Sequence, residues 1–261
     1  MTLDGRATAS LSTQSLTICG GARQLVAELS IEFAPRQFVA ILGRNGCGKT
    51  LTVHTLAGLR RPERGTVYLA GIPVPAQGRR AIARQVGLLL QDQEESFTTT
   101  ALEAVLIGRH PHLAPWRWEG AEDERVARAA LARVELGDCA LRHTGTLSGG
   151  ESRRVAIATL LAQEPQIFLL DEPTNHLDPQ HQLAVLGLFR ELADAGRTVI
   201  ATLHDPTLAA RFADRAILLF GDGRWAQGAT RDVLTGASLT ELYRTPMVEI
   251  VAPGRRVFVN A

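Results

Sequence analysis

The sequence predicts an α/β fold into which a helical subdomain is inserted. Short runs rich in Val, Ile and Leu alternate with helix-like segments along most of the 261 residues, as in sheets whose strands are buried on both faces. One stretch breaks this alternation, because residues 92–163 contain no convincing strand. The alternation favours an α/β sheet, and the interruption favours a helical insertion within a single domain that spans residues 1–261.

The predicted strands are short apolar runs at residues 37–42, 66–69, 86–90, 167–170, 198–202 and 216–220. Before the 198–202 run, apolar residues recur about one turn apart, which predicts a helix through Leu183, Leu186, Phe189 and Leu192.

Within the insertion, helices are predicted at residues 100–107, 121–136 and 149–161. The second of these gathers its apolar residues on one face, namely Val126, Ala130, Leu131 and Val134. Its arginines lie elsewhere around the helix, so we expect them on a solvated face.

The charge balance is nearly neutral, with 28 Lys and Arg against 27 Asp and Glu. This balance creates no broad field that would attract nucleic acid, and no nucleic-acid partner is predicted. No window approaches the roughly 18–20 apolar residues of a spanning helix, so any membrane role is expected to come through a partner. Cys19, Cys47 and Cys139 are far apart, which predicts free buried thiols in a reducing compartment.

A phosphate-binding loop is predicted directly after the 37–42 strand. The motif GxxxxGK[ST] is matched by Gly43, Arg44, Asn45, Gly46, Cys47, Gly48, Lys49 and Thr50, and Leu51 continues into a helix. Glycines let several N–H groups face one point, where the helix N-terminus also favours anions. Lys49 would pair with the β- and γ-phosphates of ATP, Thr50 would bind Mg²⁺, and Cys47 is interpreted as a small filler. The alternative is a chance glycine turn, which the strand–loop–helix context disfavours.

Two carboxylates, Asp171 and Glu172, end the apolar run at residues 167–170. Ligands of parallel sheets lie outside the carboxyl ends of the strands. Asp171 is therefore a candidate to hold Mg²⁺, and Glu172 a candidate general base for an attacking water. A strand followed by a polar turn is the alternative, and the phosphate loop argues against it.

The segment Leu147-Ser148-Gly149-Gly150-Glu151 resembles the signature motif of ABC ATPases. Ser148 and the two glycines open a helix, which creates a second N-terminus that favours anions. The resemblance implies that Ser148, Gly149 and Gly150 contact ATP held by a second copy of the chain. Two ATP molecules would then lie between two head-to-tail chains.

Further family elements follow in the expected order. Gln91 matches the Q-loop that touches Mg²⁺ and the attacking water, Asp178 matches the D-loop, and His204 matches the switch histidine at the γ-phosphate. The resemblance implies a P-loop NTPase core that is RecA-like, with N-terminal antiparallel β strands and a helical subdomain at residues 92–163. It also implies ATP and Mg²⁺ as cofactors.

Two positions depart from the family pattern. Residues 17–22, where the family usually carries an aromatic residue that stacks on adenine, contain none. Weaker base affinity and aliphatic packing are the two alternatives. Arg153 stands where Gln is common, and the sequence offers no account of it.

The run from Gly108 to His112 and the tail from Leu239 to Val257 resemble importers of iron–siderophore, haem and cobalamin complexes. The resemblance implies an ATP-hydrolysing subunit at the cytoplasmic face of the inner membrane, bound to integral permease subunits and indirectly served by a periplasmic or surface binding protein. The alternative is an ABC ATPase without transport, such as an iron–sulfur assembly factor. Trp116 and Trp118 are predicted to pack under a loop rather than to contact substrate.

Overall fold

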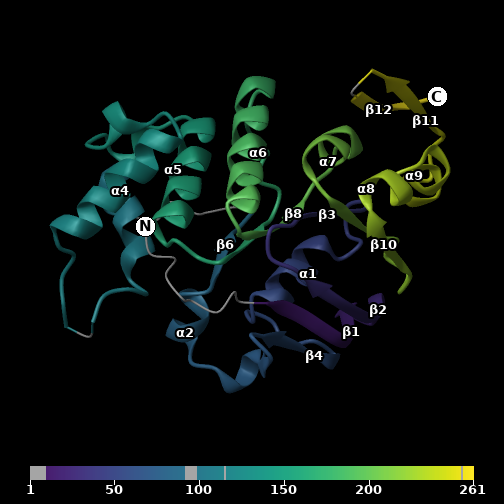
Figure 1. Cartoon of the computed structure of the whole chain (residues 1–261), viewed down its shortest axis with the longest axis horizontal. Helices are drawn as coiled ribbons and strands as arrows, with labels where there is room; N and C mark the ends of the chain where they lie inside the picture. Colours follow the sequence, from purple (N-terminus) through teal and green to yellow (C-terminus); the bar gives the residue numbers. More distant parts are fainter. Residues whose placement is uncertain (1–9, 92–98, 115, 254) are drawn as a thin grey trace.

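The computed structural model describes residues 10–91, 99–114, 116–253 and 255–261. Its centre is a six-stranded sheet (Figure 1) in the order β10 (Trp225–Ala229), β9 (Arg215–Leu219), β3 (Phe38–Leu42), β8 (Thr198–Thr202), β7 (Ile167–Leu170) and β6 (Val86–Leu89). All neighbours in this sheet are parallel except β10, which pairs antiparallel with β9. The predicted α/β sheet is therefore confirmed.

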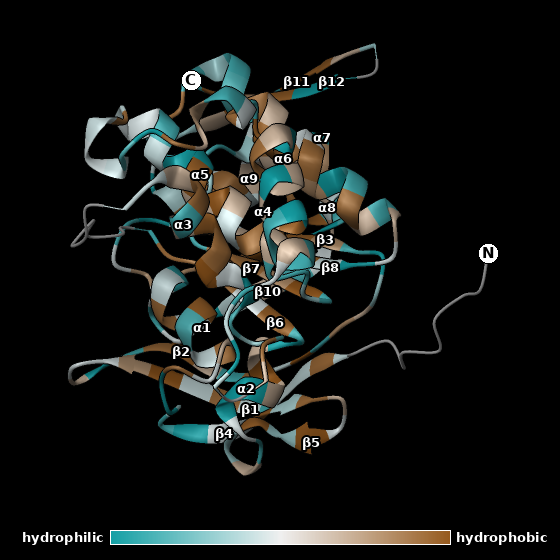
Figure 2. Cartoon of the chain, turned by 90° about the vertical axis from the view of Figure 1, so that its left-hand side faces the viewer, coloured by the Kyte–Doolittle hydropathy of each residue, from teal (hydrophilic) through white to brown (hydrophobic). Residues whose placement is uncertain are grey.

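Both faces of this sheet are buried, and side chains alternate between two hydrophobic clusters. Phe168 and Leu170 of β7 enter the cluster that includes the helices of the insertion, whereas Ile167 and Leu169 enter the cluster on the opposite face. This two-residue period is the geometry of a strand, and it explains why the runs are apolar throughout. Apolar residues gather around β6, β7 and α5 in Figure 2.

An antiparallel sheet covers one side of the core in the order β2 (Arg23–Phe33), β1 (Leu11–Gly20), β4 (Arg64–Leu69) and β5 (Ile72–Pro73). The expected N-terminal antiparallel strands are therefore present. The strand predicted at residues 66–69 lies here rather than among the parallel strands. Trp225 of β10 links the two sheets by donating its indole N–H to Ala27 O at 2.8 Å. A short helical link follows this sheet, formed by η1 (Val74–Ala76) and α2 (Arg79–Ala83).

Between β6 and β7 the described residues form helices, together with one isolated bridge between Thr100 and His143. We call residues 99–114 and 116–163 the helical region. Its elements are α3 (Ala101–Leu106), η2 (Ile107–Arg109), α4 (Ala121–Arg133), η3 (Gly137–Cys139), η4 (Thr144–Thr146) and α5 (Gly149–Ala162). They gather on one side of the molecule in Figure 1, beside α6 (Pro179–Asp194).

The predicted faces of α4 are present, but the prediction for two tryptophans is wrong. Ala130, Leu131 and Val134 are buried, while Arg125 and Arg128 are exposed and pair with carboxylates of their own helix. Trp116 and Trp118 are 101% and 87% exposed, so neither packs under a loop. The sequence pattern gave no neighbour for them, and among the described residues both side chains remain exposed.

The run from Gly108 to His112 holds the end of α5 against neighbouring elements. Arg109 is buried and donates to Ala162 O at 2.7 Å, and the His112 ring lies 2.8 Å from Gln163 O. Pro111 O accepts two hydrogen bonds, one from Arg80, which lies in α2, and one from Arg84, which directly follows α2. Arg109, Pro111 and His112 therefore all take part in hydrogen bonds that hold the fold together.

The C-terminal part adds α7 (Pro206–Phe212), α8 (Thr230–Val233), α9 (Gly236–Tyr243) and a hairpin of β11 (Met247–Ala252) and β12 (Arg255–Asn260). The Phe258 N–H donates to Thr207 Oγ1 at 3.1 Å, which ties the hairpin to α7. No helix in the described ranges is both long enough and apolar enough to cross a bilayer. Of the three free cysteines, only Cys47 is buried; Cys19 and Cys139 are half-buried, so the predicted burial is wrong for them.

Gly108 offers a test of the packing between η2 and α5. A Cβ at this position would lie 2.2 Å from Thr159 O, a backbone atom that cannot move alone. We expect Gly108→Ala to destabilise the chain by roughly 1–3 kcal/mol, the usual cost of overpacking. Thermal unfolding measures this as a lower Tm.

Gly187 in α6 is the matched control, because a Cβ there meets no atom within 4 Å. Gly187→Ala should raise stability by up to about 1 kcal/mol, since alanine favours a helix interior. Equal Tm values for the two variants would contradict the packing described here.

Candidate functional site

The predicted phosphate loop lies between β3 and α1 (Lys49–Leu56), as its sequence context indicates. Gly48 precedes the helix with φ of 105°, a conformation that strains any residue with a Cβ. At Gly43 a Cβ would lie 2.6 Å from Leu219 O. The loop can therefore curl against β9 only because these positions are glycine.

Lys49 and Cys47 occupy this loop in different ways. Lys49 is 5% exposed and its Nζ donates to Gly43 O at 2.9 Å, so the ammonium is held at the loop itself. Cys47 is buried under Gly43 and Gly221, and burial raises the pKa of its thiol against the lowering effect of Lys49. A raised pKa disfavours the thiolate, which supports its interpretation as a filler.

Asp171 and Glu172 follow β7 and are joined through Thr202, the last residue of β8. Asp171 is fully buried, and its Oδ1 accepts the Thr202 hydroxyl at 2.8 Å. The same hydroxyl oxygen accepts the Glu172 N–H at 2.8 Å. Thr202 thus fixes the two carboxylates relative to each other. Sequence reasoning missed it, although a threonine that follows the apolar residues 199–201 was a visible signal.

Glu172 is held in a strained conformation at this edge. Its φ of 49° lies in the left-handed region, which costs a residue with a Cβ about 1–2 kcal/mol. Its Oε1 lies 2.5 Å from His204 Nε2, and its Oε2 accepts the Asn175 amide. Because a carboxylate only accepts, His204 carries a proton on Nε2 in this contact. The predicted base and the predicted switch histidine are therefore neighbours.

A cleft of about 470 Å³ brings most of the predicted residues together. It is lined by Asn45, Gly46, Gly48, Lys49, Thr50, Leu51, Gln91, Glu172 and His204, together with the unpredicted Leu25 and Asn175. Of the other predicted loop residues, Gly43 packs against β9, and Cys47 packs against Gly43 and Gly221. Arg44 O accepts the Cys47 N–H at 3.2 Å. The cleft thus joins a phosphate-type loop to a carboxylate and an imidazole.

Leu25 is the side chain that sequence reasoning could not place in this cleft. It lies in β2 and packs near Gly20 and Gly48, within the reach of a Cβ built at either glycine. Of the segment without an aromatic residue, residues 17–20 belong to β1 beside it, and residues 21–22 form the turn to β2. An aliphatic side chain therefore borders the cleft beside this segment.

The signature residues lie outside this cleft. Ser148 is the N-cap of α5, where its Oγ accepts the Glu151 N–H at 3.2 Å and its N–H donates to Glu151 Oε2 at 2.8 Å. This reciprocal bond is a capping box, and the Ser148 N–H lowers the pKa of Glu151. Gly149 and Gly150 form the first turn, and neither lines the cleft. Ser148 and Gly149 are exposed at this helix start.

Asp178 is the N-cap of α6. It accepts the His181 N–H at 2.9 Å, and this bond lowers the pKa of the Asp178 carboxyl. It does not line the cleft. A Cβ at Gly150 would lie 3.5 Å from His176 O, so the segment before Asp178 runs beside the start of α5.

The C-terminal helix α9 reaches the loop that carries His204. Tyr243 donates its hydroxyl to His204 O at 3.1 Å, and burial raises the pKa of this phenol. No sequence signal linked Tyr243 to the site, because the two residues are 39 positions apart.

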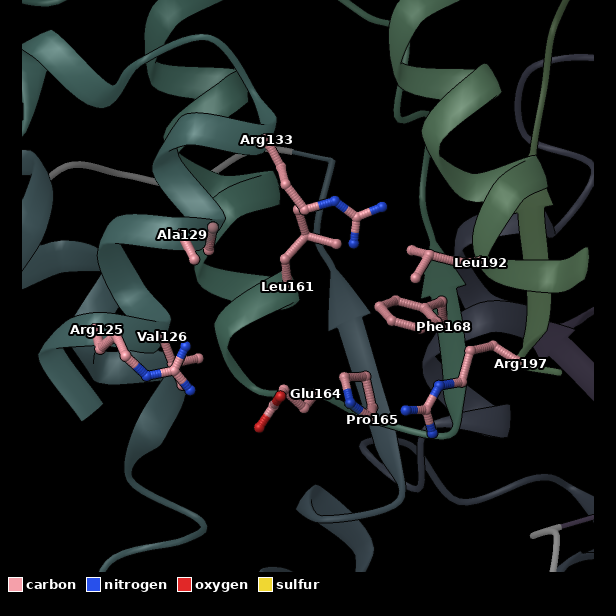
Figure 3. A pocket seen from close by; sticks show the side chains of 11 residues that line it. Arg125, Val126, Ala129, Arg133, Leu161, Glu164, Pro165, Phe168, Leu192 and Arg197 are labelled. Carbon is pink, nitrogen blue, oxygen red and sulfur yellow. The ribbon is translucent and has the colours of Figure 1, made fainter. Parts of the chain in front are cut away.

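A second cavity, of about 240 Å³, lies where α4 and α5 meet β7 and α6, and it contains none of the predicted site residues (Figure 3). Arg133 points toward Phe168 and Leu192, and Arg197 lies on the same side of the cavity as those two residues. Arg125 and Arg133 have the carboxylates of Glu122 and Glu191 as partners. We therefore assign this cavity to the joint between the helical region and the core.

The model of the ABC transporter family matches residues 26–175, more than half of the chain and most of the elements that build the cleft. The chain belongs to this family. It is thus an ATP-binding chain, and ATP hydrolysis coupled to transport is the activity of such domains in import systems.

Two relatives and one solved structure describe its neighbourhood. The ferric enterobactin transport ATP-binding protein FepC of Escherichia coli is 37% identical over 237 residues, which cover 90% of this chain and 87% of that protein. The hemin import ATP-binding protein HmuV of Pseudomonas putida is 36% identical over 251 residues, with 94% and 96% covered. A chain of an inward-facing ABC transporter assigned to the metal-chelate type has a TM-score of 0.84 at 30% identity, with 97% of this chain and 98% of that chain covered.

Replacing Glu172 tests its position at the cleft. Glu172→Gln keeps the shape of the side chain but removes the carboxylate that contacts His204. We expect ATP binding to persist and hydrolysis to slow by roughly 10²–10⁴, the usual loss without a general base. ATP turnover and the amount of an ATP-trapped dimer are the measurements. Near-normal turnover would exclude Glu172 as the base.

Proposed function

We propose that this chain is the ATP-hydrolysing subunit of an importer that takes up a metal chelate, namely an iron–siderophore, haem or cobalamin, through a partner permease. One observation carries the hydrolytic part: the Lys49 loop, Glu172 and His204 line one cleft. The names of FepC and HmuV support the substrate class.

The hydrolytic step follows from this arrangement. Lys49 and the N–H groups of the loop bind the phosphates of ATP. Glu172 accepts a proton from the attacking water, and His204, which already contacts Glu172 at 2.5 Å, stabilises the γ-phosphate. Both residues come from the ends of neighbouring strands, so their spacing is fixed by the sheet.

Thr50, Gln91 and Asp171 are the residues that would hold Mg²⁺. Among the described residues, Asp171 Oδ2 is buried without a hydrogen-bond partner, which suits a cation or its bound water. The described residues contain no group of three or more His, Cys, Asp or Glu side chains suited to a metal. This fits Mg²⁺, which binds one or two carboxylates and otherwise substrate phosphates and water. When bound, the ion neutralises charge on the β- and γ-phosphates.

Adenine would pack on an aliphatic surface. Leu25 and Leu51 line the cleft beside the phosphate loop. We propose that these side chains replace the missing aromatic residue, so base affinity rests on burial rather than on ring stacking.

A second copy of the chain completes the site. Four residues of the predicted site lie outside the chain's own cleft: Ser148, Gly149 and Gly150 at the start of α5, and Asp178 at the start of α6. Their function is explained if they close on the ATP of a partner in a head-to-tail homodimer.

The permease would dock near Gln91, which lies two residues beyond β6 and precedes the helical region; residues 92–98 lie outside the described residues. We propose that residues 92–163 act as an inserted subdomain of one ATPase domain and move when the dimer closes. The chain would then be peripheral at the cytoplasmic face of the inner membrane, served indirectly by a periplasmic or surface binding protein.

Mixed dimers test the shared site. Lys49→Ala removes the phosphate lysine, and Ser148→Arg blocks the helix start that would face a partner. Each homodimer should be inactive. A mixture should recover activity, because each mixed dimer has one site with both Lys49 and Ser148 intact and one site with both replaced. ATPase activity of the mixture against each variant alone is the measurement. A mixture no more active than its components would contradict the composite site.

Uptake assays test the substrate class. A strain that lacks this gene should lose import of one of three labelled solutes: a ferric siderophore, haem or cobalamin. The intact gene should restore uptake, whereas the Glu172→Gln gene should not. Unchanged uptake of all three, together with failed import of another solute, would refute the substrate class and leave the ATPase assignment intact.

A further inference from the structure

Arg153 is a buried guanidinium with an unusual set of acceptors. It lies in the second turn of α5 and is 6% exposed. Its Nη1 donates to Leu90 O at 2.5 Å and to Gln91 O at 3.2 Å. Its Nη2 donates to Asp171 O and Glu172 O, both at 2.7 Å. One side chain of the helical region thus binds the backbone beyond the ends of both β6 and β7.

These four carbonyls lie beyond the sheet ladder, and among them Glu172 O also accepts the Asn175 N–H at 3.2 Å. β6 ends at Leu89 and β7 at Leu170, so the following residues cannot rely on a neighbouring strand. Buried carbonyl groups without a donor are costly. A planar guanidinium presents several N–H groups in one fork, which neither the ammonium of Lys nor the amide of Gln can reproduce.

The contact fixes the residue proposed as the general base. Glu172 has a left-handed backbone that requires external support. Thr202 Oγ1 accepts its N–H, and Arg153 donates to its carbonyl, so the strained residue is held from both sides. Arg153 therefore helps to hold the backbone from which the Glu172 side chain reaches His204.

The same guanidinium links this base to the Q-loop and to the signature motif. Gln91 O is one of its acceptors. Arg153 lies in the helix that Ser148 caps, five residues after that serine. At the other end of α5, Leu161 lines the cavity at the joint with the core (Figure 3). Arg153 thus connects α5 to the backbone at the carboxyl ends of β6 and β7.

We propose that Arg153 is a positioning residue that holds Glu172 and Gln91 in their hydrolytic arrangement and couples them to the signature helix. This inference rests on the proposed function, because it concerns the same ATPase site. It explains why arginine stands where glutamine is common: the chain uses a guanidinium to bind both strand ends at once.

The test compares Arg153→Gln and Arg153→Lys with the intact chain. Both variants should bind ATP with a Kd within about twofold of the intact chain, because Arg153 is not among the residues that line the cleft. Their kcat should fall by about tenfold or more with little change in KM, since only the transition-state geometry is affected. Arg153→Lys, which keeps the charge, should be the less affected. If either variant melts below the assay temperature, the other supplies the result.

Arg154→Gln is the matched control. It makes the same substitution one position along α5, where Nη1 donates to Val134 O within the helical region. Its kcat should stay within about twofold of the intact chain. An equal loss of kcat at Arg153 and Arg154 would assign the effect to the helix in general and refute the proposal.

A double-mutant cycle separates positioning from general damage. If Arg153 acts through Glu172, then Arg153→Gln should reduce the residual hydrolysis of the Glu172→Gln chain by less than about threefold, far less than its effect in the intact chain. Equal losses in both backgrounds, or a kcat of Arg153→Gln within about twofold of the intact chain, would overturn the inference. Absence of ATPase activity in the intact chain would instead refute the proposed function.

Discussion

The site depends on one constraint: five parallel strands end at a common edge, and the ladder of hydrogen bonds between strands ends there too. β9, β3, β8, β7 and β6 lie side by side in the sheet and all point the same way. Such an edge collects ligand-binding loops, but it also leaves buried polar groups to be satisfied. The chain meets this requirement with side chains, and each of those side chains also orients a residue of the cleft.

Thr202 and Arg153 illustrate how this works. The hydroxyl of Thr202 serves Asp171 Oδ1 and the Glu172 N–H, and Arg153 serves the carbonyls of both residues. Glu172 can keep a left-handed backbone because both of its peptide groups are held. The same hydrogen bonds therefore hold Glu172 in place and provide partners for the polar backbone groups beyond β7.

The sequence predicts the parts of this site that are local. A strand, a glycine loop and a helix start are contiguous at residues 38–56, and two carboxylates directly follow a buried strand, so their pattern indicates their place. Leu25, Asn175 and Thr202 join the site only through tertiary packing, which no single segment encodes. β10 and the C-terminal hairpin escaped prediction for a related reason: their burial is partial and leaves only a weak apolar pattern. Trp116 and Trp118 show the reverse error, because apolar composition alone does not create a partner.

Distance along the chain therefore says little about influence on the cleft. Glu172 is held from the helical region through Arg153, and the loop of His204 is held from the C-terminal part through Tyr243. The phosphate loop packs against β9, a strand of the core, through Gly43. Binding of nucleotide can thus be a property of the core, whereas the geometry for hydrolysis requires all three parts to be in place. A chain organised in this way can hold ATP before the surrounding parts allow it to react.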